Sequence, residues 1–196
     1  VSPVQKRIPI YLASLGPKNL QMTGELADGW LPIWSHQGHL AGLKEQVAKG
    51  AALAGRNISE ITVSPQIMCH VADGAEDLAD ATRRIRAHMT YYIGGMGSYY
   101  YDLFSRYGYR AEADALREAW AAGDRAGAAA SITDEMLDNI VIIGDAAACR
   151  AKLDQFRRSG SDVPMVAFPR GTSLPAMLRT LEALAPEGTS RTKPSQ

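Results

Sequence analysis

The chain has 196 residues, of which 21 are basic and 21 acidic, so its formal net charge is zero. A neutral chain lacks the positive surface that nucleic acid requires, and no uninterrupted apolar run reaches the roughly 20 residues of a membrane span. We therefore expect neither nucleic acid nor a membrane as a partner. Cys69 and Cys149 lie far apart and outside any CxxC pair, so we interpret them as small buried residues of a cytoplasmic protein.

Short apolar runs alternate with amphipathic stretches along much of the chain. Breaks such as Gly16-Pro17 and Asp28-Gly29 separate them. The patterns predict strands at 8–14, 30–34, 61–72 and 163–168, and helices at 19–26, 40–54, 75–88, 109–130, 133–140, 146–159 and 174–184. The interval 91–101 is rich in tyrosine and glycine and is expected to form a loop or a helix junction.

The alternation of strand and helix predicts an α/β fold with a parallel sheet. Four βα units are half of a (β/α)₈ barrel, which would leave two open edges; an open flavodoxin-like sheet is the alternative. Residues 75–140 are expected to form a helical insertion between the third and fourth strands. The chain opens at Val1 with an apolar run close behind, so we expect it to continue a longer protein, and we expect 186–196 to be a flexible tail.

Gly16-Pro17 lies between the first strand and the first helix. A helix N-terminus offers unpaired N–H groups and the positive end of the helix dipole, and glycine lets an anion approach the backbone. Ser14 adds a hydroxyl and Lys18 a charge at the rim. The pattern is typical of a phosphate-binding turn, although Gly-Pro also occurs in ordinary βα turns.

In a barrel, the carboxyl ends of the strands carry the active site. At these ends Trp34 is a candidate wall of a substrate pocket, His36 a group that binds or polarises substrate, and Arg170 a partner for an anion. The simpler readings are packing for Trp34, a solvated loop histidine for His36 and a surface ion pair for Arg170. His70, inside an apolar strand, reads as a core histidine.

Residues 91–97, YYIGGMG, form the most unusual patch. Tyr91 and Tyr92 beside several glycines suit a loop that closes over a planar ligand, while a packed helix junction is the alternative. The histidines have no metal-ligand spacing with acidic residues, so we expect no metal site.

Three segments resemble the luciferase-like monooxygenase superfamily, and in particular its branch that depends on the deazaflavin coenzyme F420. Residues 8–28 hold an apolar run, Gly-Pro and a helix that ends in Ala27-Asp28-Gly29. Residues 91–97 resemble the insertion of one subgroup of these enzymes. Residues 142–160, IIGDAAACRAKLDQFRRSG, resemble the late helix of the family, with Asp145-Ala146 where Thr/Ser-Pro is usual.

The resemblance implies that residues 1–185 are the C-terminal portion of a (β/α)₈ barrel. It implies hydride transfer between coenzyme F420 and a small organic substrate, with little activity for this chain alone. An FMN-dependent monooxygenase on the same fold and a non-catalytic α/β binding module are the alternatives, and a homodimer is one open option for assembly. The cofactor would lie against the segment made of Ala13, Ser14, Leu15, Gly16, Pro17 and Lys18.

Overall fold

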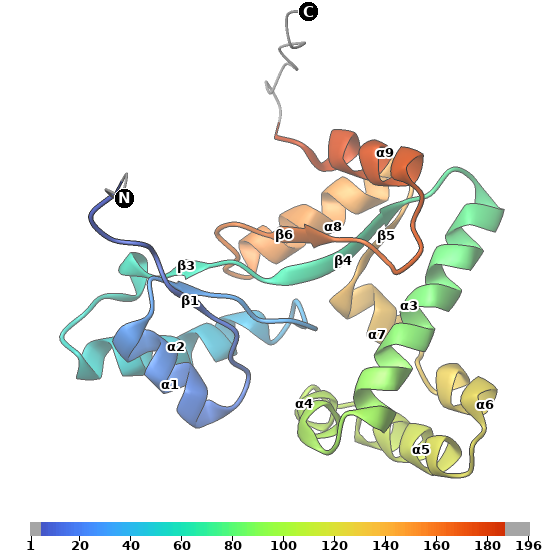
Figure 1. Ribbon diagram of the computed structural model, residues 1–196, viewed down its shortest axis with the longest axis horizontal. Coiled ribbons are helices and arrows are strands. Elements are labelled where there is room, and N and C mark those ends of the chain that lie inside the picture. The colour runs from blue at the N-terminus through green and yellow to red at the C-terminus, as the bar shows by residue number, and fades with distance from the viewer. Residues whose placement is uncertain (1–4, 187–196) are drawn as a thin grey trace, which may run out of the picture.

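The computed structural model describes residues 5–186 and shows parallel strands connected by helices (Figure 1). The part up to the longest strand contains β1 (Tyr11–Leu12), α1 (Pro17–Leu26), β2 (Gly29–Trp30), α2 (Leu40–Leu53), the 3-10 turn η1 (Ile58–Glu60), β3 (Thr62–Val63) and β4 (Gln66–Val71). The remainder contains α3 (Ala75–Gly95), α4 (Tyr99–Arg106), α5 (Arg110–Ala121), α6 (Arg125–Ala130), α7 (Asp134–Ile140), β5 (Ile142–Gly144), α8 (Ala146–Arg158), β6 (Met165–Ala167) and α9 (Leu174–Leu184).

Every strand pair is parallel, in the orders β1-β2-β3 and β5-β4-β6. β3 and β4 are two parts of one expected strand, interrupted near Pro65, whose nitrogen has no hydrogen to donate to a ladder. A bridge from Ile33 to Gln66 joins the β2 segment to the start of β4. β5 pairs with residues 69–71 of β4, and β6 pairs with residues 66–68 on the opposite edge of β4. The expected parallel α/β arrangement is confirmed.

The strand expected at 8–14 is shorter in the structure and is largely exposed. Only Tyr11 and Leu12 pair with a neighbour, and the exposed fractions of Ile8 and Ile10 are 73% and 57%. The reason is that β1 is the outer strand of its sheet, so nothing in the described part of the chain covers its far edge. The pairing that does form is tight, since a Cβ on Gly29 would lie 2.2 Å from the Tyr11 ring.

α1 and α2 pack against each other through facing glycines. A Cβ built on Gly24 would lie 2.0 Å from the carbonyl oxygen of Val47, and one on Gly50 would lie 1.9 Å from that of Gln21. Because these neighbours are backbone atoms, only glycine permits the two helices to approach this closely. The position of α1, and of the turn that begins it, is therefore fixed by α2.

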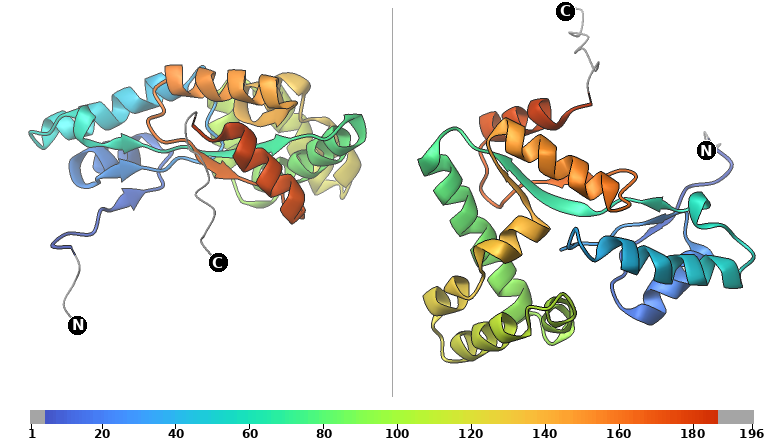
Figure 2. Two further views of the ribbon diagram at one scale, coloured as in Figure 1. Left: turned by 90° about the horizontal axis from the view of Figure 1, so that it is seen from above. Right: turned by 180° about the vertical axis from the view of Figure 1, so that it is seen from behind.

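Residues 75–140, which we call the helical segment, contain α3 to α7 and no strand. Figures 1 and 2 show this segment at one end of the molecule and the α1–α2 pair at the other, with β4 running between them. Two expected boundaries change: α3 continues to Gly95, so that Tyr91 and Tyr92 are helical, and the expected helix at 109–130 is broken at Gly123, whose φ is +79°. Thr133 caps α7 as expected, with its hydroxyl accepting from the Met136 N–H at 3.2 Å.

His70 is a fully buried residue of β4, as expected of a core histidine. Its Nε2 lies 3.0 Å from an oxygen of Asp77 at the start of α3, and Asp77 also accepts from Arg179 of α9 at 2.6 Å. Arg179 in turn donates to the carbonyl oxygen of Val71 at 2.9 Å. This network joins the end of β4 to the helices on both sides of it.

No helix among residues 5–186 is long and apolar enough to cross a membrane. The expected tail begins at residue 186, and residues 187–196 lie outside the described part of the chain.

Candidate functional site

The turn before α1 leaves the first turn of the helix open. Gly16 is the N-cap residue with φ −85° and ψ 149°, Pro17 is the first helical residue, and no side chain caps the helix. Pro17, Lys18 and Asn19 are exposed. A Cβ on Gly16 would meet a single atom within 4 Å, the hydroxyl oxygen of Tyr99 at 3.6 Å. The backbone N–H groups here are thus accessible to a ligand.

The three predicted cofactor-binding residues before this turn differ in burial and in hydrogen bonding. The Ser14 hydroxyl is buried and lies 2.7 Å from that of Thr23, and the Ser14 carbonyl accepts from the indole N–H of Trp30 at 2.8 Å. Leu15 is buried in the core, whereas Ala13 is exposed. An anion at this turn would consequently meet the backbone from Gly16 onward and not the hydroxyl of Ser14.

Trp34 turns the chain away from the sheet after β2. Its φ is +55°, and it is the only non-glycine residue with a positive φ among residues 5–186. The side chain is buried at 2% exposure and its ring contacts His88 at 5.3 Å and Tyr92 at 5.5 Å between centroids. Its indole nitrogen has no hydrogen-bond partner among the described residues. A bulky residue in this backbone region is strained, a condition that clusters at functional sites.

His36 is held inside a hydrogen-bond network. The Gly38 N–H donates to Nδ1 at 2.9 Å, so Nε2 carries the ring proton and donates to the Tyr109 hydroxyl at 3.1 Å. Asn139 donates to the same hydroxyl at 3.0 Å. Burial and the nearby charge of His39 lower the pKa of His36 to about 4, so the ring is neutral at physiological pH. His36 therefore joins the β2–α2 connection to the helical segment.

A cavity of about 540 Å³ lies between α3 and the loop after β6. It brings together Arg170, Tyr91 and Tyr92, three residues for which the sequence predicts a role in substrate binding, and it does not include Trp34 or His36. The lining residues are Arg84, Ala87, His88, Tyr91, Tyr92 and Arg170. Since Arg170 follows β6 and α3 follows β4, the cavity lies at the carboxyl ends of the strands, where active sites of such folds are found.

Five rings form what we call the aromatic wall: Trp34, His88, Tyr92, Tyr99 and Tyr100. Successive centroids are 5.0 Å apart for His88–Tyr92, 4.6 Å for Tyr92–Tyr100 and 5.8 Å for Tyr100–Tyr99. Tyr99 reaches the turn at Gly16, and His88 and Tyr92 line the cavity. The wall thus connects the open end of α1 to the cavity along one face of the molecule.

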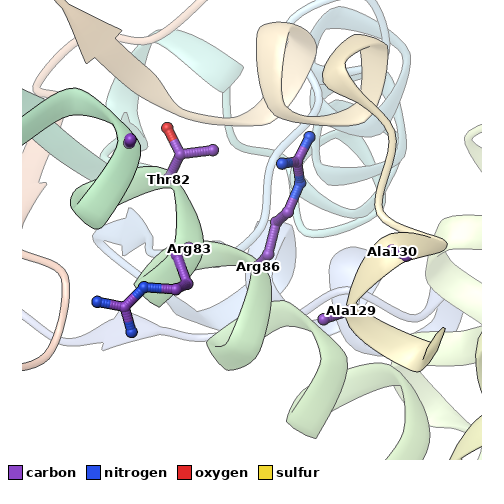
Figure 3. A pocket seen from close by; sticks show the side chains of 6 residues that line it. Thr82, Arg83, Arg86, Ala129 and Ala130 are labelled. Carbon is purple, nitrogen blue, oxygen red and sulfur yellow. The ribbon is translucent and has the colours of Figure 1, made fainter. Parts of the chain in front are cut away.

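A second hollow lies between α3 and α6 (Figure 3). Its lining includes Arg83 and Arg86, whose side chains point away from each other, and its volume is about 380 Å³. Arg86 is already committed to the carbonyl of Ile132 at 3.1 Å and to the carboxylate of Asp134 at 2.5 Å. This hollow lies on the helical segment, away from the strand ends. Within residues 5–186 no group of three or more His, Cys, Asp or Glu side chains could hold a metal ion.

Arg84 and His88 are cavity residues that the sequence analysis did not single out. They stand seven and three positions before Tyr91, so all three share one face of α3. Extending the helix at 75–88 through the tyrosines would have placed them together. The glycines at 94 and 95 favoured a loop instead, yet Gly94 lies against Trp120, where a Cβ would come within 2.7 Å of the indole ring.

Comparisons with known proteins agree with this architecture. Residues 1–162 match the family described as luciferase-like monooxygenase. The chain is 31% identical over 191 residues to a Mycobacterium tuberculosis protein named as a coenzyme F420-dependent oxidoreductase, covering 93% of this chain and 52% of that protein. It is 28% identical over 169 residues to a 5,10-methylenetetrahydromethanopterin reductase of Archaeoglobus fulgidus, covering 84% and 49%.

The structure is similar to that of the coenzyme F420-dependent tetrahydromethanopterin reductase from Methanopyrus kandleri, with a TM-score of 0.68 at 21% identity over 89% of this chain and 49% of that one. It is also similar to an F420-dependent secondary alcohol dehydrogenase, with a TM-score of 0.62 at 14% identity over 92% and 50%. These likenesses show a shared fold. The chain spans about half the length of the relatives that it matches.

Proposed function

The chain belongs to the luciferase-like monooxygenase family, and from this premise we propose that it is the C-terminal half of a (β/α)₈-barrel oxidoreductase that transfers a hydride between coenzyme F420 and a small organic substrate. The relatives named above as F420-dependent support the choice of coenzyme. The observation that carries the proposal is the aromatic wall, because it joins an open helix N-terminus to a cavity at the carboxyl ends of the strands.

The open sheet edges support the half-barrel. β1 and β6 each lie at an edge of their sheet. Apolar side chains in or next to these strands are exposed: the exposed fraction is 57% for Ile10 just before β1, 56% for Val163 just before β6 and 40% for Met165 in β6. A closed barrel has no such edges. Strands from the remainder of the native protein would pair with β1 and β6 and cover these side chains.

The turn at Gly16 fits the phosphate of the coenzyme. The uncapped N–H groups of the first turn of α1 would donate to the phosphate oxygens, and Lys18 would add a positive charge at the rim. The open space where a Cβ on Gly16 would stand leaves room for the anion. When bound, the coenzyme supplies the carbon that gives or accepts the hydride.

The rest of the chain would position the reactants and exclude water. Aromatic faces suit a planar ring system, and Tyr92 and Tyr100 are half-buried between the turn and the cavity. Trp34, the most buried ring of the wall, contacts Tyr92 and His88 and would hold these two rings in place. The cavity would hold the substrate at the far end of the wall.

Titration of the native protein with coenzyme F420 tests this proposal, with Gly16→Val as the variant. Gly16 has φ and ψ that valine accepts, and its surroundings are open, so the variant should melt like wild type. A blocked approach of one anion to the backbone should weaken binding roughly ten- to a hundredfold. Gly42→Val is the control, since nothing lies within 4 Å of a Cβ there.

Equal affinities of wild type and Gly16→Val would remove the turn from the cofactor site. A parallel titration with FMN separates the flavin-dependent alternative, because preferential uptake of FMN would replace the deazaflavin assignment. Binding of neither compound would favour a non-catalytic module.

A further inference from the structure

One face of α3 and the loop after β6 place two arginines beside one cavity. Arg84, His88 and Tyr91 are spaced by four and three residues on α3 and face Arg170 across the cavity of about 540 Å³. None of the residues that line this cavity is acidic. A hollow with this lining attracts an anion and repels a cation.

Arg170 is held at the corner of a tight turn. The Thr172 N–H donates to the Pro169 carbonyl at 3.0 Å, the Thr172 hydroxyl donates to the same oxygen at 2.6 Å, and Gly171 adopts φ +82°. Glycine is favoured at such a position because a side chain would strain the backbone. The turn thus fixes the direction in which Arg170 leaves the backbone.

The two arginines differ in their partners. Arg84 donates to the Arg170 carbonyl at 3.4 Å and forms an ion pair at 2.6 Å with Asp80, which also pairs with Arg83, so the charge of Arg84 has a carboxylate partner. Arg170 is exposed, and within residues 5–186 no carboxylate pairs with its guanidinium. The uncompensated charge of the cavity therefore belongs to Arg170, and Arg84 positions the turn that carries it.

His88 completes the polar side of the cavity. Burial and the charge of Arg170 lower the pKa of His88, which keeps its ring neutral at physiological pH. Its Nδ1 is buried and has no hydrogen-bond partner among the described residues. Beside these groups on α3, Ala87 and the rings of Tyr91 and Tyr92 line the same cavity.

We propose that this cavity is an anion subsite that takes the carboxylate or phosphate group of a small substrate with an apolar or aromatic body. Arg170 would bind the anionic group, and Tyr91 and Tyr92 would contact the body. The inference rests on the proposed function only in assigning the anion to the substrate. The phosphate of the coenzyme has the same chemistry and is the source that the experiment has to separate.

The experiment is isothermal titration of the native protein with phenyl phosphate, with benzyl alcohol as the neutral probe. We expect Arg170→Gln to weaken phenyl phosphate binding by roughly tenfold or more, and Arg170→Lys to retain most of the affinity because it keeps the charge. Arg83→Gln is the matched control: Arg83 is the neighbour of Arg84 on α3, its side chain is 74% exposed and it does not line this cavity. Equal losses in Arg170→Gln and Arg83→Gln, or stronger binding of benzyl alcohol than of phenyl phosphate, would overturn the subsite.

A competition with coenzyme F420 identifies the source of the anion. Simultaneous binding of coenzyme and phenyl phosphate supports a substrate subsite, whereas displacement of the probe by the coenzyme assigns the cavity to the coenzyme phosphate and overturns the substrate assignment. Binding of phenyl phosphate that depends on Arg170, in a protein that does not bind coenzyme F420, would refute the proposed function and leave the anion subsite standing. Binding of the coenzyme without binding of phenyl phosphate would overturn the anion subsite and leave the proposed function standing.

Discussion

Gly50 lies at the close contact between α1 and α2, so adding one methyl group there should lower the stability of the fold. Alanine at 50 would place its Cβ 1.9 Å from the carbonyl oxygen of Gln21 and within 2.7 Å of two more backbone atoms of that residue. Because an ordinary contact needs about 3.5 Å, α1 would have to retreat by about 1.5 Å. Such overpacking typically costs about 1–3 kcal/mol, and a backbone clash belongs at or above the upper end.

Part of that cost is offset, since alanine is favoured over glycine in a helix by about 1 kcal/mol. We expect a net loss of about 2 kcal/mol for Gly50→Ala, which lowers the melting temperature of a chain of this size by roughly 4–8 °C. The movement of α1 would also displace the turn at Gly16, so affinity for the coenzyme should fall together with stability.

Urea unfolding followed by circular dichroism, with a thermal melt, measures this effect. Gly42→Ala is the control on the same helix, because no atom lies within 4 Å of its Cβ, and it should leave stability unchanged or raise it by up to about 1 kcal/mol. A Gly50→Ala variant that is as stable as Gly42→Ala would show that the two helices do not depend on this close approach.

Three further results are expected. The pKa of His36 is about 4 in the folded chain and 6.5 when unperturbed, so the unfolded chain binds more protons between these values, and up to about 3 kcal/mol of stability should be lost as pH falls from 6.5 to 4. Denaturant titrations should show the free energy of unfolding falling over this pH range in wild type and changing less in His36→Gln, and identical pH dependences would contradict the lowered pKa of His36. Asp77→Asn should lower the free energy of unfolding by about 1–3 kcal/mol, because it weakens the contacts to His70 and Arg179; a variant as stable as wild type would mean that the network is dispensable. The purified chain should show no turnover with coenzyme F420 and substrate, since both sheet edges are open, and turnover without an added partner would refute the half-barrel.

Local signals in the sequence are sufficient to predict much of this fold. Gly16-Pro17 opens a helix, Thr133 caps another, and Gly160 with φ +106° follows the end of α8. Each of these depends on backbone preferences within a few residues, which a single sequence displays. The parallel alternation follows from the same signals, because helices between strands connect parallel neighbours.

Features that depend on distant contacts were not predictable in this way. β5 is three residues long and becomes a strand only because β4 presents a free edge beyond Ile33. Nothing near His36 in sequence indicates that Tyr109 would occupy its Nε2, since 73 positions separate the two residues. The positive φ of Trp34 likewise follows from packing against α3 and not from its own preference.

The pairing of β4 with β5 brings the two ends of the helical segment together. Val71 is paired with Gly144, and the Ala72 N–H donates to the Gly144 carbonyl at 2.8 Å, so the chain leaves the sheet and returns to it at adjacent positions. A segment whose two ends are neighbours can be lengthened, shortened or replaced without changing the register of the strands beneath it. Engineering of substrate preference could therefore graft a different helical segment at this junction while α1, with its open N-terminus, is left untouched.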